Sequence, residues 1–170
     1  VADPRYLSVT SRHIFIKMPD ADFEPRVNDH RIGYFVNKST DLTSYENFPN
    51  FALINKWRLI KKDPDAELSE PIEPIVYWVE NSTPEEIIPA VVAGIENWNI
   101  AFEEAGFKNA IVAKIQPKEA TWDAADYDYN VVRWSSEPDA SLLGFGPSVT
   151  NPLTGEIISA DVVNKLLAVK

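Results

Sequence analysis

The chain contains no cysteine, and this absence excludes disulfide bonds, cysteine nucleophiles and thiolate ligands for a metal. Histidine is scarce as well, since only His13 and His30 occur and they do not form a helical i, i+4 pair. A catalytic zinc usually takes three protein ligands, commonly histidines, so these two do not make a zinc site. We interpret both as ordinary surface or hydrogen-bonded histidines.

Long apolar runs are also missing. No segment approaches the length of a membrane span, and no signal-peptide pattern is present. The 26 acidic residues outnumber the 16 basic ones, and a net charge of -10 repels phosphate backbones and anionic lipid headgroups. We therefore expect neither nucleic acid nor a membrane span. Because the first residue is Val1 rather than Met, we interpret the chain as part of a longer or processed protein.

The composition is nevertheless that of a folded protein. Apolar residues make up 45% of the 170 residues and aromatic residues 11%, including five Trp, which is more than a disordered chain carries. A domain of this length buries roughly 70% of its unfolded surface, so we expect a hydrophobic core.

Proline recurs through residues 1–70 and excludes long helices there. Short β-prone segments lie between the prolines, and we expect strands at His13–Lys17 and Arg31–Val36. Lys61–Pro71 is polar and bounded by proline, as a linker or exposed loop is. We interpret residues 1–70 as an extended arm and linker that end a preceding domain, and residues 71–170 as the compact part.

A long helix is predicted after the strand-like run Ile75–Val79. Thr83, Pro84 and Glu86 have the spacing of a capping box, and Gly106 is placed to end the helix in a left-handed cap. We expect the helix over residues 84–105, although Pro89 removes one of its hydrogen bonds and makes the first turn irregular. The apolar positions recur at helical steps and predict one buried stripe: Ile88, Val91, Val92, Ile95, Trp98, Phe102 and Ala105.

Strand composition returns at Ala110–Ile115 and Tyr129–Trp134, and a strand, a helix and a strand predict a parallel βαβ unit. Further on, Gly144–Val149 and Glu156–Val163 flank a turn at Thr150–Gly155 and should pair as a hairpin. The expected fold class is α/β (α+β): a mixed, mostly parallel sheet of about five strands over residues 74–163, one long helix packed on it through Trp98 and Phe102, and an extended N-terminal arm.

Acidic side chains are the remaining candidates for chemistry. Asp123, Asp126 and Asp128 lie in a loop where carboxylates can gather calcium, but their spacing is not that of an EF-hand, and a solvated loop is the interpretation we favour. Five carboxylates of the predicted helix lie off its apolar stripe and should face water: Glu85, Glu86, Glu96, Glu103 and Glu104. No pair of acids has a spacing that fixes a glycosidase separation.

Taken in order, the predicted elements resemble the upper half of a metzincin-type catalytic domain. The amino-acid sequence itself resembles a family of large bacterial zinc-dependent metalloproteases of the Bacteroidetes type. The matching phrases spread over nearly the whole chain. They are Phe23–Phe35, Lys56–Pro64, Ser69–Pro71, Pro74–Tyr77, Trp98–Ile111, Tyr129–Trp134 and Asn151–Ile157.

This resemblance implies a secreted or cell-envelope zinc metallopeptidase that cleaves peptide or protein substrates. The family's H-E-x-x-H helix, third His and Met-turn have no counterpart before Lys170, so none of its zinc ligands or its general base can be carried over to this chain. We expect the 170 residues to lack protease activity and tight zinc binding, with zinc bound only in the full-length protein. The resemblance does imply an edge strand that lines substrate backbone: Gly144, Phe145, Gly146, Pro147, Ser148 and Val149.

Other interpretations stay open. Gly144–Val149 would equally suit a plain hairpin strand. The whole chain would also suit a non-enzymatic binding or scaffold module that contacts a protein or a glycan, and a third, weaker interpretation is a two-carboxylate hydrolase. If an active-site helix packs on the sheet only in the full-length protein, the chain alone should expose an apolar face and self-associate, or cover that face with its N-terminal arm.

Overall fold

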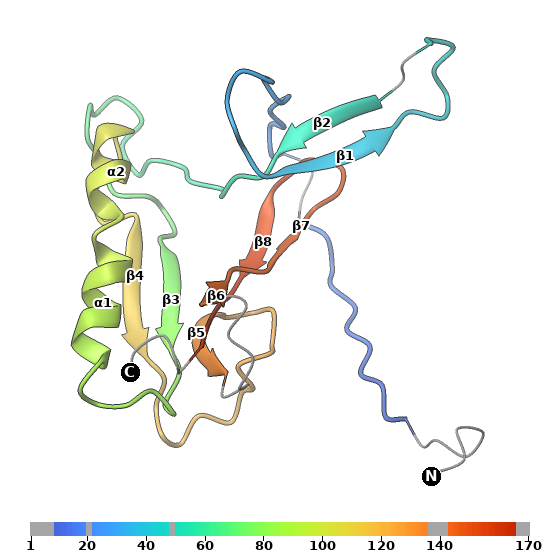
Figure 1. Ribbon diagram of the computed structural model, residues 1–170. Helices are drawn as coiled ribbons and strands as arrows, with labels where there is room; N and C mark the ends of the chain where they lie inside the picture. The colour runs from blue at the N-terminus through green and yellow to red at the C-terminus, as the bar shows by residue number, and fades with distance from the viewer. Residues whose placement is uncertain (1–8, 20–21, 48–49, 136–142, 166–170) are drawn as a thin grey trace.

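The computed structural model describes residues 9–19, 22–47, 50–135 and 143–165 (Figure 1). Its centre is a mixed five-stranded sheet in which four neighbouring strands run parallel and the last, an edge strand, runs antiparallel. In spatial order the strands are β4 (Ile111–Ile115), β3 (Ile75–Val79), β5 (Asn130–Ser135), β9 (Val162–Lys165) and β6 (Gly144–Phe145). The predicted fold class and the parallel βαβ unit are confirmed.

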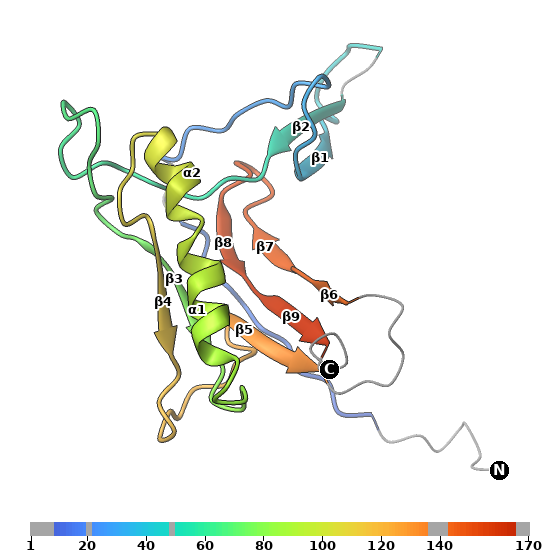
Figure 2. The ribbon, with the colours of Figure 1, turned by 60° about the vertical axis from the view of Figure 1, so that its left-hand side comes forward.

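The helical stretch lies along β4 and β3 on one face of this sheet (Figure 2). It consists of α1 (Ile88–Glu96) and α2 (Asn99–Glu104). The end is as predicted, because Gly106 has φ +87 and the N–H groups of Gly106 and Phe107 donate to the carbonyls of Glu103 and Phe102, as in a Schellman motif.

The start of the helix differs from the prediction. The capping box at Thr83 does not form, since α1 begins at Ile88 with Ile87 as an N-cap that makes no side-chain hydrogen bond. Thr83 is buried, and its hydroxyl accepts a hydrogen bond of 2.9 Å from the indole of Trp134. Pro89 explains the shift: in the first turn its missing N–H removes no intrahelical bond, so the helix begins immediately before it.

Trp98 is not a core residue, which contradicts the predicted stripe. Its side chain is 63% exposed, and Phe102 is half-buried. The helical run is interrupted at Asn97 and Trp98, so one straight apolar stripe does not continue from α1 into α2. The five carboxylates expected to face water are all exposed. The side chains with no exposed surface lie instead in the sheet and at its start: Val79, Ala110 and Val131.

Two small antiparallel sheets complete the fold. The β1 strand (Val36–Thr40) pairs with β2 (Asn50–Ile54), and β7 (Ser148–Thr150) pairs with β8 (Ile157–Ala160), which confirms the predicted hairpin. The strand expected at Arg31–Val36 begins only at Val36, because the Asp29 carboxylate accepts the N–H of Arg31 and holds a turn there. His13–Lys17 is not a strand, since no described segment pairs with it.

The N-terminal arm (residues 1–70) contacts the remainder of the protein at several places. Single-residue bridges join Lys56 to Glu156 and Ser69 to Phe107, and Lys61 pairs with Pro71 within a folded-back loop. Nothing in these contacts decides where a domain ends, so the division at residue 70 stays a prediction. Among the described residues, no helix has the length and apolarity needed to cross a membrane.

The burial pattern gives a first prediction. Replacing the fully buried Val79 by Ala should lower the free energy of unfolding by roughly 2 kcal/mol, because it leaves a cavity in the sheet. Replacing Trp98 by Ala should cost less than about 1 kcal/mol, since most of that side chain already meets solvent. Urea titration of both variants measures the difference, and a larger loss for Trp98→Ala than for Val79→Ala would contradict the described packing.

Candidate functional site

An open groove of about 720 Å³ lies between the helical stretch and strands β8 and β9, which Figure 2 shows on either side. Its lining is mainly apolar and comes from every layer of the fold. The helices contribute Val91, Ile95, Trp98 and Phe102, the sheet contributes Ile75, Ile111, Val132 and Val162, and the arm contributes Phe35 and Trp57. An apolar groove of this size with few polar groups is the usual form of a binding site.

Three polar side chains interrupt the apolar lining: Tyr77, Asp161 and Asn164. Asp161 lies between β8 and β9, where its Oδ1 accepts the N–H of Val131 at 3.0 Å and its Oδ2 is 3.6 Å from the Arg133 guanidinium. Burial raises the pKa of Asp161, while the hydrogen bond from Val131 and the charge of Arg133 oppose the shift. Burial also raises the pKa of Tyr77 to about 12, and the charge of Asp161 adds to that rise.

Ala160, the residue before Asp161, is held by the side chain of Asn130. The Asn130 amide donates to the carbonyl of Val76 on β3 and accepts the N–H of Ala160 on β8, both at 2.9 Å. These bonds tie β3, β5 and β8 together beside the groove. The sequence contained a signal that our predictions did not use, since Asp161 is the single charged residue inside the apolar run Ile157–Val163.

The edge segment Gly144–Val149 borders the groove through Gly146. It is divided into β6, two linking residues and β7, and all of it except Val149 is exposed. We call this segment the rim. The carbonyls of Leu143 and Pro147 accept the N–H groups of Lys165 and Asp161, so these carbonyls point inward, to β9 and to the residue directly before it. By the alternation of an antiparallel ladder, the backbone groups of Gly144, Gly146 and Ser148 point outward from the sheet.

The other predicted site residues are not among those that line the groove. His13 and His30 are exposed, and the His13 ring lies 3.2 Å from the Ser11 hydroxyl. Asp123 and Asp126 lie 3.4 Å and 3.9 Å from the Arg12 guanidinium. The pKa of Asp123 is lowered mainly by the hydrogen bond from the Ala125 N–H, and Arg12 lowers it further.

Within the described parts of the chain, no three His, Asp or Glu side chains converge to hold a metal ion. The described lining of the groove contains a single carboxylate, Asp161, so it offers no carboxylate pair for a hydrolase.

Comparison with known proteins adds one finding. Residues 2–62 match the model of a family described as a domain of unknown function, DUF5117, and the match covers less than half of the chain. No curated protein and no solved structure matches the chain significantly. The match covers most of the N-terminal arm, including Phe35 and Trp57 of the groove, and it carries no activity with it.

The coupling between Tyr77 and Asp161 gives a second prediction. In the folded chain Tyr77 should ionise near pH 12, and Asp161→Asn should lower that pKa because it removes a negative charge but keeps the hydrogen-bond acceptor. Ultraviolet absorbance of the phenolate, with Tyr77→Phe subtracted, measures the titration. An unchanged midpoint in Asp161→Asn would show that Tyr77 does not feel this charge.

The same shift predicts a pH dependence of stability. An unfolded tyrosine loses its proton near pH 10, whereas folded Tyr77 keeps it to about 12. The stabilising contribution of the neutral phenol is therefore complete below pH 10 and is lost as the pH rises from 10 to about 12. Urea titrations across this range should show a steeper loss for the unaltered protein than for Tyr77→Phe, and parallel losses would contradict the shift.

Proposed function

We propose that this chain forms the upper, sheet-containing part of the catalytic domain of a zinc-dependent metalloendopeptidase, preceded by its N-terminal arm. The observation that carries the proposal is the rim. An antiparallel edge strand borders an open groove and directs the backbone groups of Gly144, Gly146 and Ser148 away from the sheet. An extended peptide can pair with such an edge as an additional strand, which is how several protein classes bind peptides.

The two glycines of the rim suit this role because they leave two of its three outward-facing positions without a side chain. A Cβ on Gly144 would lie 3.0 Å from the Asn164 amide oxygen and 3.1 Å from the Val163 carbonyl, so the backbone there fits tightly against β9. A Cβ on Gly146 would meet only the Asp161 carbonyl, at 3.5 Å. Substitution at Gly146 is therefore tolerated and can test the outer edge alone.

Zinc enters the proposal only through the full-length protein. In such enzymes zinc supplies an activated water and polarises the scissile carbonyl. The described residues do not fit a zinc site, because no three ligand side chains converge among them. We therefore assign no step of hydrolysis to this chain and give it the binding of substrate backbone. By the same resemblance, we propose a secreted or envelope location for the full-length protein.

The apolar lining of the groove favours a second candidate. A groove with a single carboxylate and mainly apolar walls also suits a binding or scaffold module that contacts a partner protein. In the peptidase proposal the groove instead receives the active-site helix of the full-length protein. The two candidates differ in whether zinc-dependent hydrolysis exists at all.

Zinc uptake and peptide hydrolysis give the decisive test. The purified 170-residue chain should neither bind zinc at micromolar concentration nor cleave fluorogenic peptides, whereas the full-length protein should do both. Calorimetry with zinc and a chelator-controlled peptide assay check these outcomes. Tight zinc uptake by the short chain would show a site that we have missed, and an inactive full-length protein would favour the binding module.

The rim can be tested separately in the full-length protein. Gly146→Pro removes the outward N–H, and its Cβ meets only the Asp161 carbonyl at 3.5 Å, so peptide hydrolysis should fall several-fold through a higher KM, as expected for one lost hydrogen bond. Ser148→Ala keeps every backbone group and is the matched control. Equal kinetics for Gly146→Pro and the unaltered protein would mean that substrate does not pair with this edge.

The open groove predicts a difference between the two lengths of protein. The 170-residue chain should bind an environment-sensitive apolar dye and self-associate, because the groove leaves Trp98, Phe102 and Val162 accessible. In the full-length protein this dye signal should be lost, since the groove is filled. Light scattering and dye fluorescence measure both effects, and a dilution-stable monomer that binds no dye would contradict the expectation.

A further inference from the structure

The β7–β8 hairpin carries the outer half of the rim, and the N-terminal arm holds this hairpin at its turn. The backbone of Lys56 pairs with β8 in parallel: its N–H donates to the Gly155 carbonyl at 3.0 Å and its carbonyl accepts the N–H of Ile157 at 2.9 Å. Gly155 has φ +77, and a Cβ there would collide with the carbonyl of Ile54 at the end of β2. The turn and the arm therefore fit together with no room for a side chain.

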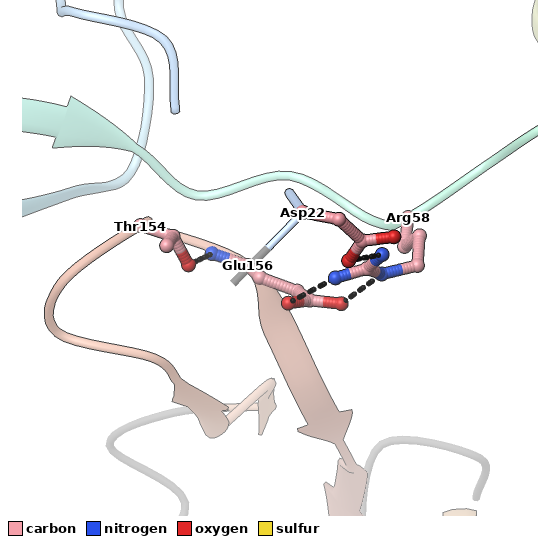
Figure 3. Close-up of polar contacts among 4 residues, drawn as sticks. All are labelled: Asp22, Arg58, Thr154 and Glu156. Atoms are coloured by element: carbon pink, nitrogen blue, oxygen red, sulfur yellow. Dashed lines mark hydrogen bonds and ion pairs between the residues drawn. The ribbon is translucent and has the colours of Figure 1, made fainter. Parts of the chain in front are cut away.

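An ion pair between a buried carboxylate and a partly exposed guanidinium secures the β8 side of the hairpin (Figure 3). Glu156 is 4% exposed, and its carboxylate accepts bonds of 2.6 Å and 3.1 Å from Nε and Nη2 of Arg58. Asp22 accepts a further bond of 2.6 Å from Nη1 of the same guanidinium. The ring of buried Phe23 lies 5.3 Å from the Arg58 guanidinium carbon and 4.7 Å from the Lys56 ammonium.

A buried carboxylate needs such a partner, because leaving it unpaired in a nonpolar environment is strongly unfavourable. The hydrogen bonds to Glu156 and then to Asp22 raise the pKa of Arg58 above its already high value. The charge on Arg58 is therefore present over the whole pH range in which the protein folds. Glu156, at the end of the turn, can stay charged and buried in this position only while Arg58 lies against it.

A second contact holds the β7 side. The Asn37 amide on β1 donates to the Thr150 hydroxyl at 2.8 Å and to the Asn151 carbonyl at 3.3 Å. The Thr150 hydroxyl donates back to Asn37 Oδ1 at 3.0 Å. These bonds lie beside the irregularity between Val149 and Thr150, where the pairing of β7 with β8 shifts register. The arm thus contacts both sides of the hairpin, and it does so from outside the five-stranded sheet.

We propose that the N-terminal arm, most of which is the region matched by the family of unknown function, is a brace that sets the position of the rim. Arg58 and Asn37 are its positioning residues: they touch the hairpin rather than a substrate. The proposal rests on the proposed function only in treating the rim as the surface that binds peptide. An arm that merely stabilised the whole fold would protect the amides of every strand from exchange equally. A brace protects the amides of the hairpin more than those of the central strands.

Amide hydrogen exchange on the 170-residue chain separates these alternatives. In Arg58→Ala the amides of β8 should exchange roughly tenfold faster or more, since the buried Glu156 then favours opening of the hairpin, while those of β3 and β4 should change by less than about twofold. In Arg58→Lys the exchange rate of the β8 amides should lie between those of Arg58→Ala and the unaltered protein, because a lysine keeps the positive charge but can make only one of the contacts. Arg31→Ala is the matched control, as it breaks an ion pair within the arm, to Asp29, that does not touch the hairpin.

Asn37→Ala keeps the proposal testable should Arg58→Ala fail to fold, because it removes no charge from a buried pair. It should speed exchange in β7 more than in β3. Equal acceleration in β3 and β8, or none in either hairpin strand, would overturn the brace. The proposed function fails separately: if full-length protein cleaves no peptide while the hairpin still loosens in Arg58→Ala, the brace stands and the peptidase does not.

Discussion

The buried carboxylate of Glu156 is the constraint on which the arrangement of this protein depends. A charge with 4% exposure is stable only with a fixed partner, and Arg58, nearly one hundred residues earlier, supplies it. The pair brings the arm beside the turn of the β7–β8 hairpin, and Lys56 forms a one-residue parallel bridge with Glu156, directly before β8. An arm that is rich in proline and poor in strands of its own thus becomes part of the fold of the residues that follow it.

The side-chain amides of three asparagines form hydrogen bonds with groups at the ends of strands. Asn99 on α2 accepts the N–H of Ile111 and donates to its carbonyl, which occupies the outer edge of β4 at its start. Asn130 joins β3 to β8, and Asn37 joins β1 to the end of β7. An amide carries a donor and an acceptor on one group, so it can replace a strand where only one residue needs pairing. The β4 edge is partly closed in this way, whereas no backbone group among the described residues pairs with the outward groups of the rim.

The groove and the rim adjoin each other, because Gly146 of the rim is also part of the groove lining. Because α1 lies mainly over β4 and β3, the sheet face at β5 and β9 stays open, and the apolar side chains of Val132 and Val162 there line the groove. The antiparallel edge strand then borders this open face rather than a covered one. Asp161, whose burial raises its pKa, lies where the edge and the groove meet. This placement gives the peptide-binding proposal its geometry.

Local patterns in the sequence were enough to predict the sheet, the helical stretch, its glycine cap at Gly106 and the β7–β8 hairpin. Those features depend on β-branched runs, on helical spacing and on turn residues, all of which act over a few neighbours. The same patterns misplaced Trp98 and Thr83, because burial and capping depend on which sheet face is covered and on a partner such as Trp134, far away in sequence. The groove, the outward backbone of the rim and the pairing of Arg58 with Glu156 belong to tertiary structure alone. They join segments separated by about a hundred residues or more, and no periodicity within either segment records where the other will lie.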